Sequence, residues 1–132
     1  MKKENHLRNI QESLAVIEEC IEKGLVARQR TLGFSLSAAS ADFLELLLHQ
    51  LNLIDQGFTV KHEWLKSKRK VTDKLPFDFP QKKEILSLMA DIEERRNTLC
   101  YGSPQKEEVI RDLLEKFHKL RNIFKEVGLD ES

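Results

Sequence analysis

The chain has 132 residues, the usual size of a single domain, and its 22 basic side chains balance 22 acidic ones. A net charge of zero argues against a protein that coats nucleic acid or membrane through bulk electrostatics, so any contact with phosphate needs a local patch. Leu occurs 20 times against five Gly and three Pro, which favours a helical domain over a β-sandwich or a disordered chain.

The sequence shows no sign of a membrane or secretory segment. No apolar run approaches the roughly 18–20 residues of a membrane span, and the charged start leads into an amphipathic segment rather than a signal-peptide core. Cys20 and Cys100 are too few for a disulfide framework and fit reduced thiols. We therefore expect a cytoplasmic protein with no membrane partner.

Apolar periodicity predicts the first two long helices. Between residues 5 and 29, Leu and Ile recur at steps of three and four, which places one apolar stripe on an amphipathic helix. Residues 31–55 are apolar nearly all round, which is typical of a central helix that stops before Gly57. Within it, residues 35–41 are all Ser or Ala except Leu36, so another helix of this domain or of a second subunit can approach closely.

The middle of the chain is the least regular part. Thr59 is placed to cap a short helix over residues 61–68, and residues 61–74 carry six Lys or Arg against two acids. The two prolines of residues 75–80 then predict an extended or turning connection. We interpret this segment as a loop inside one domain, because neither side of it has enough helices to close a core.

A further helix is expected over residues 80–100, where apolar residues recur at steps of four and three. Asp78 and Gln81 resemble a capping box at its start. Gly102 is expected to end it.

The last helix is expected over residues 104–127, with Ser103 as its cap and Pro104 at its first position. The sequence thus predicts an all-α fold. A single domain spans residues 1–132 as an up-and-down bundle of four long helices plus one short helix.

The end of the fourth long segment combines polar chemistry with an unusual position. Arg96 falls where periodicity places the buried stripe, and an unpaired guanidinium in a core is strongly unfavourable. Asp42 is a similarly isolated carboxylate inside the apolar second helix, so the two are predicted to form a charge-assisted pair. The alternative is that Asp42 lies on an exposed edge and that Arg96 extends to solvent.

Arg96 followed by Asn97, with Tyr101 at the helix end, resembles the motif of HEPN domains, in which an Arg and a polar residue precede a His by a few positions. The resemblance covers essentially the whole chain, since HEPN domains are helical, of about this length, and carry the motif between their last two long helices. It implies a homodimer whose two motifs meet in a shared cleft. Many members cleave RNA without metal, and many are encoded beside a minimal nucleotidyltransferase that acts as antitoxin or catalytic partner.

Tyr101 stands where an active HEPN domain has His. The resemblance therefore makes Arg96 and Asn97 candidate phosphate-binding and positioning residues, while the general acid/base does not carry over. A phenol, with a pKa of about 10, is a poor base at neutral pH, whereas imidazole titrates there. Tyr101 can still donate a hydrogen bond, or accept a nucleotidyl group from a partner enzyme.

The rest of the sequence offers weaker signals. There is no phosphate-binding Gly loop, nucleophile elbow or paired-Cys spacing, so we expect no metal and no cofactor. Lys68, Arg69 and Lys70 are either a solvated face or contacts to RNA or a nucleotide, and Cys100 is expected to be a packed thiol. Four scattered histidines are expected to be solvated or capping residues: His6, His49, His62 and His118.

Three functions remain open at this point. The first is a HEPN-like dimeric partner subunit of a minimal nucleotidyltransferase, as one component of a toxin–antitoxin pair. The second is a metal-independent RNA endonuclease that uses Arg96 and Asn97, with Tyr101 or His118 in place of the motif histidine. The third is a non-catalytic helical adaptor whose Ser/Ala face and apolar surface bind another protein.

Overall fold

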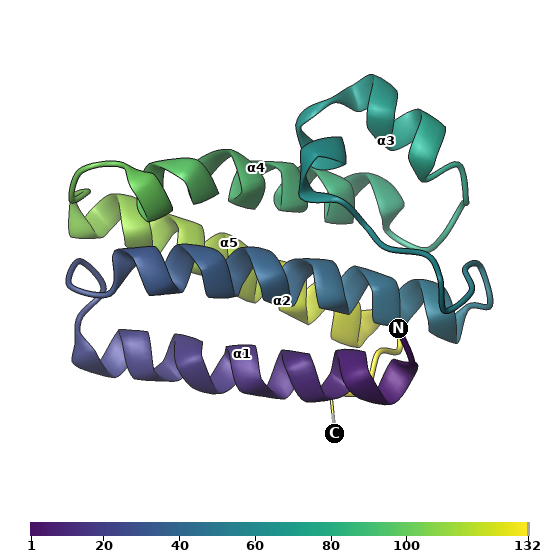
Figure 1. Ribbon diagram of the computed structural model, residues 1–132, viewed down its shortest axis with the longest axis horizontal. Coiled ribbons are helices and arrows are strands. Elements are labelled where there is room, and N and C mark those ends of the chain that lie inside the picture. The colour runs from purple at the N-terminus through teal and green to yellow at the C-terminus, as the bar shows by residue number, and fades with distance from the viewer. Residues whose placement is uncertain (132) are drawn as a thin grey trace.

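Each of the four apolar stripes forms a long helix in the computed structural model, which describes residues 1–131 (Figure 1). The long helices are α1 (Lys3–Lys23), α2 (Gln29–Gln50), α4 (Lys82–Tyr101) and α5 (Glu107–Glu126). Successive long helices run in opposite directions, and the described residues contain no strand. The fold is therefore an all-α, up-and-down bundle, as the sequence predicted.

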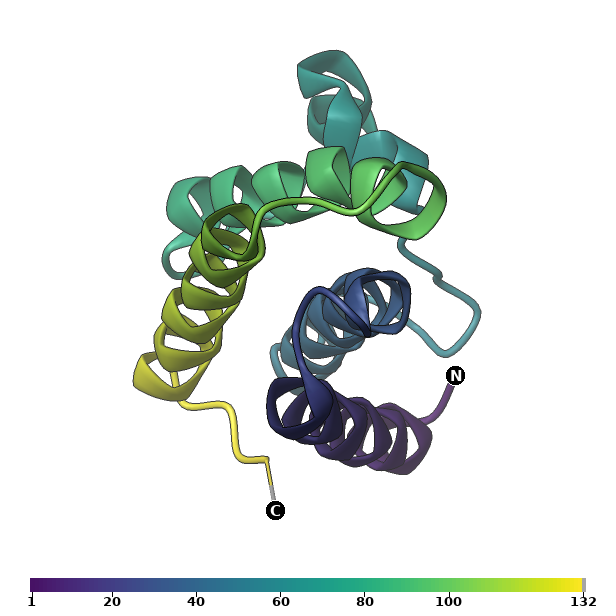
Figure 2. The same cartoon turned by 90° about the vertical axis from the view of Figure 1, so that its left-hand side faces the viewer.

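α2 is the central helix because it is apolar on nearly every side. Leu36, Phe43, Leu44 and Leu47 have no exposed surface, and α2 packs against α1, α4 and α5. Viewed end-on, α1 and α2 form one pair, while α4 and α5 enclose the other side (Figure 2). Phe43 stacks on Phe124 of α5 with the ring centroids 5.3 Å apart, and burying each such side chain contributes about 1.5–3 kcal/mol.

By length and composition alone, α2 is also able to cross a membrane, although the sequence analysis expected no such segment. Two thirds of this apolar window is buried inside the bundle. The core helix of a soluble protein passes the same test, and the burial of α2 is compatible with that state.

The small side chains of α2 pack within the domain. Ser37, Ala39 and Ser40 are buried. Nearby, a Cβ added to Gly33 would lie 3.0 Å from atoms of Leu99 and Cys100 on α4, so the two helices approach closely there. The buried side of the Ser/Ala stretch is therefore used for packing inside the domain, while Ala38 is exposed.

Residues 51–81 leave the bundle at the end of α2 and return to it at the start of α4, with α3 standing out beyond α4 (Figures 1 and 2). This excursion contains the expected short helix as η1 (His62–Lys66), a 3-10 helix, and a second short helix, α3 (Lys68–Lys74), that was not expected. The residue before η1 is Lys61, and no side chain caps η1, so the predicted cap at Thr59 is wrong. Buried Trp64 and Leu65 anchor the excursion in the core.

The first two helices end earlier than predicted. α1 ends at Lys23 instead of residue 29 because Gly24 adopts a φ of 119° and its N–H bonds to the carbonyl of Cys20. α2 ends at Gln50 instead of residue 55, and Asn52 just beyond it has a left-handed φ of 59°.

The starts of the last two helices also differ from the prediction. Gln81 precedes α4 in a left-handed conformation and makes no side-chain cap, so the predicted capping box with Asp78 does not form. α5 begins only at Glu107, and Ser103 and Pro104 belong to an irregular connection instead of capping and opening the helix.

Candidate functional site

The HEPN-like motif lies at the C-terminal end of α4, and buried Gln29 at the start of α2 holds that end in place. Gln29 Nε2 donates to the carbonyl oxygens of Leu99 at 3.2 Å and Ser103 at 3.1 Å. Gln29 Oε1 accepts the backbone N–H of Gln105 at 2.8 Å. Three hydrogen bonds from one side chain therefore give the α4–α5 connection a defined backbone.

Arg96 is partly buried, with 27% of its side chain exposed. Its guanidinium lies over the ring of Phe34 on α2, 5.0 Å from the centroid, and its Nε lies 4.0 Å from Oε1 of Glu93. This cation–π contact and the carboxylate stabilise the guanidinium at the surface.

Asp42 is not the partner of Arg96, and the predicted pair is wrong. Asp42 Oδ1 lies 2.8 Å from Nδ1 of His6 on α1. The reason is one of helix geometry: Asp42 follows Phe34, the residue beneath Arg96, by eight positions, which is about 12 Å along α2.

Tyr101 is exposed at the end of α4, at 65%. Its ring meets Phe34 edge to face with the centroids 5.9 Å apart, and the guanidinium of Arg30 lies 5.8 Å from the centroid of each ring. Asn97 is exposed on α4 and makes no side-chain hydrogen bond within residues 1–131. The end of α4 therefore presents two cations and two aromatic rings: Arg30, Arg96, Phe34 and Tyr101. The sequence analysis did not predict that Arg30 and Phe34 belong to this surface.

Beside Arg96, a buried carboxylate holds a histidine. The side chain of Glu93 is 3% exposed, and its Oε2 lies 3.0 Å from Nδ1 of His62. The same oxygen accepts the hydroxyl of Ser37 at 2.8 Å, and Ser37 Oγ lies 3.0 Å from His62 Nδ1. An ionised carboxylate only accepts hydrogen bonds, so Nδ1 carries a proton, and in the neutral imidazole Nε2 is the nitrogen with the lone pair.

The charge of Glu93 is what keeps His62 in this orientation. Burial alone would raise the pKa of Glu93, but hydrogen bonds from His62 and Ser37 and the charge of Arg96 hold that pKa below its usual value. Glu93 is thus ionised at neutral pH. With 38% of the His62 side chain exposed, an imidazole oriented in this way can accept a proton from a bound substrate.

Sequence reasoning missed all three residues of this network. Glu93 could have been recognised as a residue near the core, because it lies three residues before Arg96 and four after Met89, next to the predicted buried stripe. Ser37 looked like a packing residue, and His62 lay in a segment without periodicity. Neither of those two could have been assigned from sequence alone.

His118, one of the two residues expected to replace the motif histidine, lies elsewhere. It sits on α5 and lines a hollow with Glu84, Glu115 and Lys119, none of which belongs to the motif. The structure therefore brings His62, and not His118, to the Glu93 carboxylate beside Arg96.

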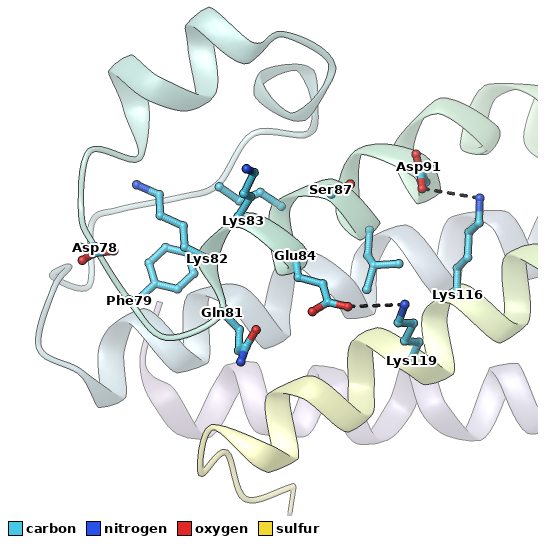
Figure 3. A pocket seen from close by; sticks show the side chains of 12 residues that line it. Asp78, Phe79, Gln81, Lys82, Lys83, Glu84, Ser87, Asp91, Lys116 and Lys119 are labelled. Carbon is cyan, nitrogen blue, oxygen red and sulfur yellow. Dashed lines mark ion pairs between the residues drawn. The ribbon is translucent and has the colours of Figure 1, made fainter.

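A hollow of about 1010 Å³ opens between α4 and α5, away from the motif. Four of its charged side chains form two ion pairs across the two helices (Figure 3). Asp91 lies 3.5 Å from Lys116, and Glu84 lies 3.4 Å from Lys119. No residue of the Arg96 motif lines this hollow.

The predicted contact residues Lys68, Arg69 and Lys70 are exposed on α3. Arg69 Nε lies 4.0 Å from Asp73 on the same helix, a surface pair that contributes little. α3 directly follows η1, the helix that carries His62. The position of these cations is compatible with either interpretation made from the sequence.

Cys100 is a packed thiol. It is 4% exposed, and its Sγ lies 3.5 Å from the carbonyl oxygen of Arg30. Burial raises the pKa of the Cys100 thiol, so it is protonated at neutral pH and is a poor nucleophile.

The end of α4 thus combines three chemical capacities. Arg96 and Arg30 can bind phosphate, the exposed ring of Tyr101 can stack on a base, and His62 can accept a proton. The chain matches no protein-family model, no curated protein and no solved structure.

Proposed function

We propose that this protein is a HEPN-like, metal-independent RNA endonuclease of the cytoplasm, in which His62 takes the part of the motif histidine. The observation that carries the proposal is the buried Glu93 carboxylate, which orients His62 at 3.0 Å and lies beside Arg96. The resemblance of Arg96 and Asn97 to the HEPN motif supplies RNA as the substrate class. A proton acceptor and a phosphate-binding cation then lie on either side of one carboxylate.

The proposed reaction uses the neighbouring hydroxyl of RNA as its nucleophile. His62 Nε2 removes the proton of a ribose 2′-hydroxyl, and the oxygen attacks the adjacent phosphorus. The bond from phosphorus to the 5′-oxygen of the next nucleotide breaks, which leaves a 2′,3′-cyclic phosphate and a 5′-hydroxyl. The leaving oxygen takes its proton from the Tyr101 hydroxyl or from water, while Arg96 stabilises the negative charge that develops on the phosphoryl oxygens.

The test is incubation of transfer RNA and messenger RNA with the purified chain in EDTA. We expect the wild type to cut RNA and to leave 2′,3′-cyclic phosphate ends. His62→Ala and Arg96→Ala should each lower the rate by about 100-fold or more, the usual contribution of a general base or a charge-stabilising group. His118→Ala is the matched control and should keep the wild-type rate, and a thermal melt of each variant verifies its fold.

Two outcomes would contradict this proposal. Undiminished cleavage by folded His62→Ala would reject the imidazole as the base. Absence of cleavage by the wild type would reject the endonuclease and leave the second candidate function.

That second candidate is a dimeric partner subunit of a minimal nucleotidyltransferase, as one component of a toxin–antitoxin pair. It is favoured by the 65% exposure of Tyr101, whose hydroxyl can accept a nucleotidyl group, and by Arg30, which lies 5.8 Å from its ring centroid and can bind the phosphate. Transfer of labelled nucleotide to the wild type, but not to Tyr101→Phe, by such an enzyme would support this function.

The adaptor function gains no support from the surface. Half of the small side chains in the Ser/Ala stretch are buried inside the domain: Ser37, Ala39 and Ser40. The large apolar side chains that are exposed are few and scattered along the chain: Met1, Ile21, Val26, Leu51 and Tyr101.

A further inference from the structure

A second polar cluster lies between α1 and α2, in the half of α2 away from Arg96. His6, Glu45 and His49 are buried at 0%, 6% and 7% exposure, and the Asp42 side chain is 15% exposed. Asp42, Glu45 and His49 follow one another at steps of three and four, so they share one face of α2. The proposed RNA chemistry uses none of these four residues.

The geometry at His6 leaves one ring nitrogen without a hydrogen-bond partner. Nδ1 lies 2.8 Å from Asp42 Oδ1 and donates its proton there. Nε2 lies 3.3 Å from Glu45 Oε2 and makes no hydrogen bond in the buried interior, so in a neutral ring its lone pair faces the carboxylate oxygen. Two lone pairs facing each other repel unless a proton or a cation lies between them.

A second imidazole in the cluster, that of His49, also has a ring nitrogen without a hydrogen-bond partner. Nε2 of His49 is buried with no hydrogen-bond partner, and its ring centroid lies 5.5 Å from that of His6. Buried polar atoms in native proteins almost always have a partner. Two unpartnered imidazole nitrogens beside a buried carboxylate therefore indicate a ligand.

We propose that this cluster binds one divalent transition-metal ion, with Zn²⁺ as the best fit, through His6 Nε2 and Glu45 Oε2, beside the buried ring of His49. Zinc bonds of about 2.1 Å place tetrahedral ligand atoms about 3.4 Å apart, close to the 3.3 Å between His6 Nε2 and Glu45 Oε2. The donor atoms of His6, Asp42 and Glu45 all lie within 4.8 Å of one another. Imidazole and carboxylate donors suit Zn²⁺ better than Ca²⁺, which prefers oxygen ligands alone.

The surrounding hydrogen bonds are those that orient metal ligands in proteins. Asp42 fixes the tautomer and the ring of His6 through Nδ1, and the backbone N–H of Val60 donates to Glu45 Oε1 at 2.5 Å, which leaves Oε2 for the ion. Burial raises the pKa of both Asp42 and Glu45, because two carboxylates without a full counter-charge are unfavourable in the interior. A proton on His6 cancels one of these charges, whereas a divalent ion cancels both.

The test uses chain stripped with EDTA and titrated with Co²⁺, whose visible absorption reports tetrahedral coordination, followed by displacement with Zn²⁺. We expect one Co²⁺ per chain, displaced by Zn²⁺, and a rise in Tm of roughly 10 °C when Zn²⁺ is 100-fold above its Kd. Glu45→Gln should weaken Co²⁺ binding by at least about 10-fold while its amide oxygen still accepts the Val60 N–H. His118→Gln and His62→Gln are controls that should bind as the wild type does.

Two results would overturn the proposal, and neither depends on RNA cleavage. Absence of stoichiometric Co²⁺ absorption together with an unchanged Tm in Zn²⁺ would mean that protonated His6 bridges the two carboxylates instead. Binding that survives in Glu45→Gln but is lost in His62→Gln would place the ion at the other histidine.

Discussion

Glu93 is the residue on which most of the candidate site depends, because it touches three other members at once. One carboxylate oxygen accepts from Ser37 and lies against His62, while the other lies 4.0 Å from Arg96. A buried charge with these partners is stabilised by them, and each partner is oriented by it. The consequences of removing the charge can therefore be measured both in stability and in its dependence on pH.

We expect Glu93→Gln to lower the free energy of unfolding by about 1–3 kcal/mol at pH 7, because the hydrogen bonds to a charged group are lost. The pKa of Glu93 in the folded chain lies below its value in the unfolded chain. Its ionisation thus stabilises the fold above about pH 4.3, and this contribution disappears as the pH falls through the lowered folded pKa. In urea unfolding, the gap between wild type and variant should shrink on the acid side.

Glu94→Gln is the matched control, since Glu94 is the exposed neighbour of Glu93 on the same helix. It should change the free energy of unfolding by no more than about 0.5 kcal/mol. A gap for Glu93→Gln that stays constant from neutral pH into strong acid would show that Glu93 is not held ionised by its partners.

At this scale, the sequence singled out Arg96 but predicted the wrong partner for it. Arg96 could be recognised because a cation interrupts a regular apolar stripe. Its pairing with Asp42 could not be judged, because periodicity says which face a residue occupies but not which residue of another helix lies opposite. His6, the actual partner of Asp42, is 36 residues away in the chain.

At the scale of the helices, Gln29 at the start of α2 forms hydrogen bonds to the end of α4 and to the connection that leads into α5. It binds the last turn of α4 through Leu99 and the connection to α5 through Ser103 and Gln105. Gln29→Ala should lower the free energy of unfolding by about 1–3 kcal/mol, since the carbonyl of Leu99 and the N–H of Gln105 lose their side-chain partner. Amide exchange at Gln105 should become faster in the variant.

Gln50→Ala, at the other end of the same helix, is the control for that prediction. Gln50 is exposed and makes one hydrogen bond, to the carbonyl of Gly128 at 3.2 Å, so its loss should cost no more than about 0.5 kcal/mol. Equal destabilisation by the two variants would contradict the anchoring role of Gln29.

The existence of the helices was predictable, and their ends were less so. The stripes of α1, α4 and α5 bury one side each, and periodicity detects that directly. The predicted start of the last helix at Ser103 failed because Gln29, 74 residues away, holds that carbonyl in the connection. Local capping rules do not include such a distant partner.

For the whole molecule, the resemblance to HEPN domains predicts a homodimer. Light scattering at micromolar concentration should give about twice the chain mass of 15.4 kDa. The exposed ring of Tyr101 and the partly buried ring of Phe34 would lie at the contact. A monomeric mass would remove the shared cleft but not the site, because Arg96, Glu93 and His62 meet within one chain.

The bundle followed from the sequence at this scale, whereas the assembly of the site did not. Three amphipathic segments and one helix that is apolar nearly all round have few ways to bury their apolar faces together. The candidate site, by contrast, joins Ser37 of α2, His62 of η1 and Glu93 of α4. The position of His62 depends on how residues 51–81 fold back, and that excursion has no periodicity from which to infer it.

The carboxylate of Glu45 links the His6 cluster to the segment that carries His62. Its Oε1 holds the amide of Val60, two residues before His62, and its Oε2 faces His6. A ligand at Glu45 Oε2 would therefore alter the hydrogen bond from Val60 to Glu45 Oε1, which holds the backbone leading to His62. If a ligand at His6 changes the affinity of the His62 surface for RNA by some factor, RNA must change the affinity of the His6 cluster for that ligand by the same factor. If both proposals hold, an ion bound between α1 and α2 and an RNA bound at His62 would therefore be linked through this one carboxylate.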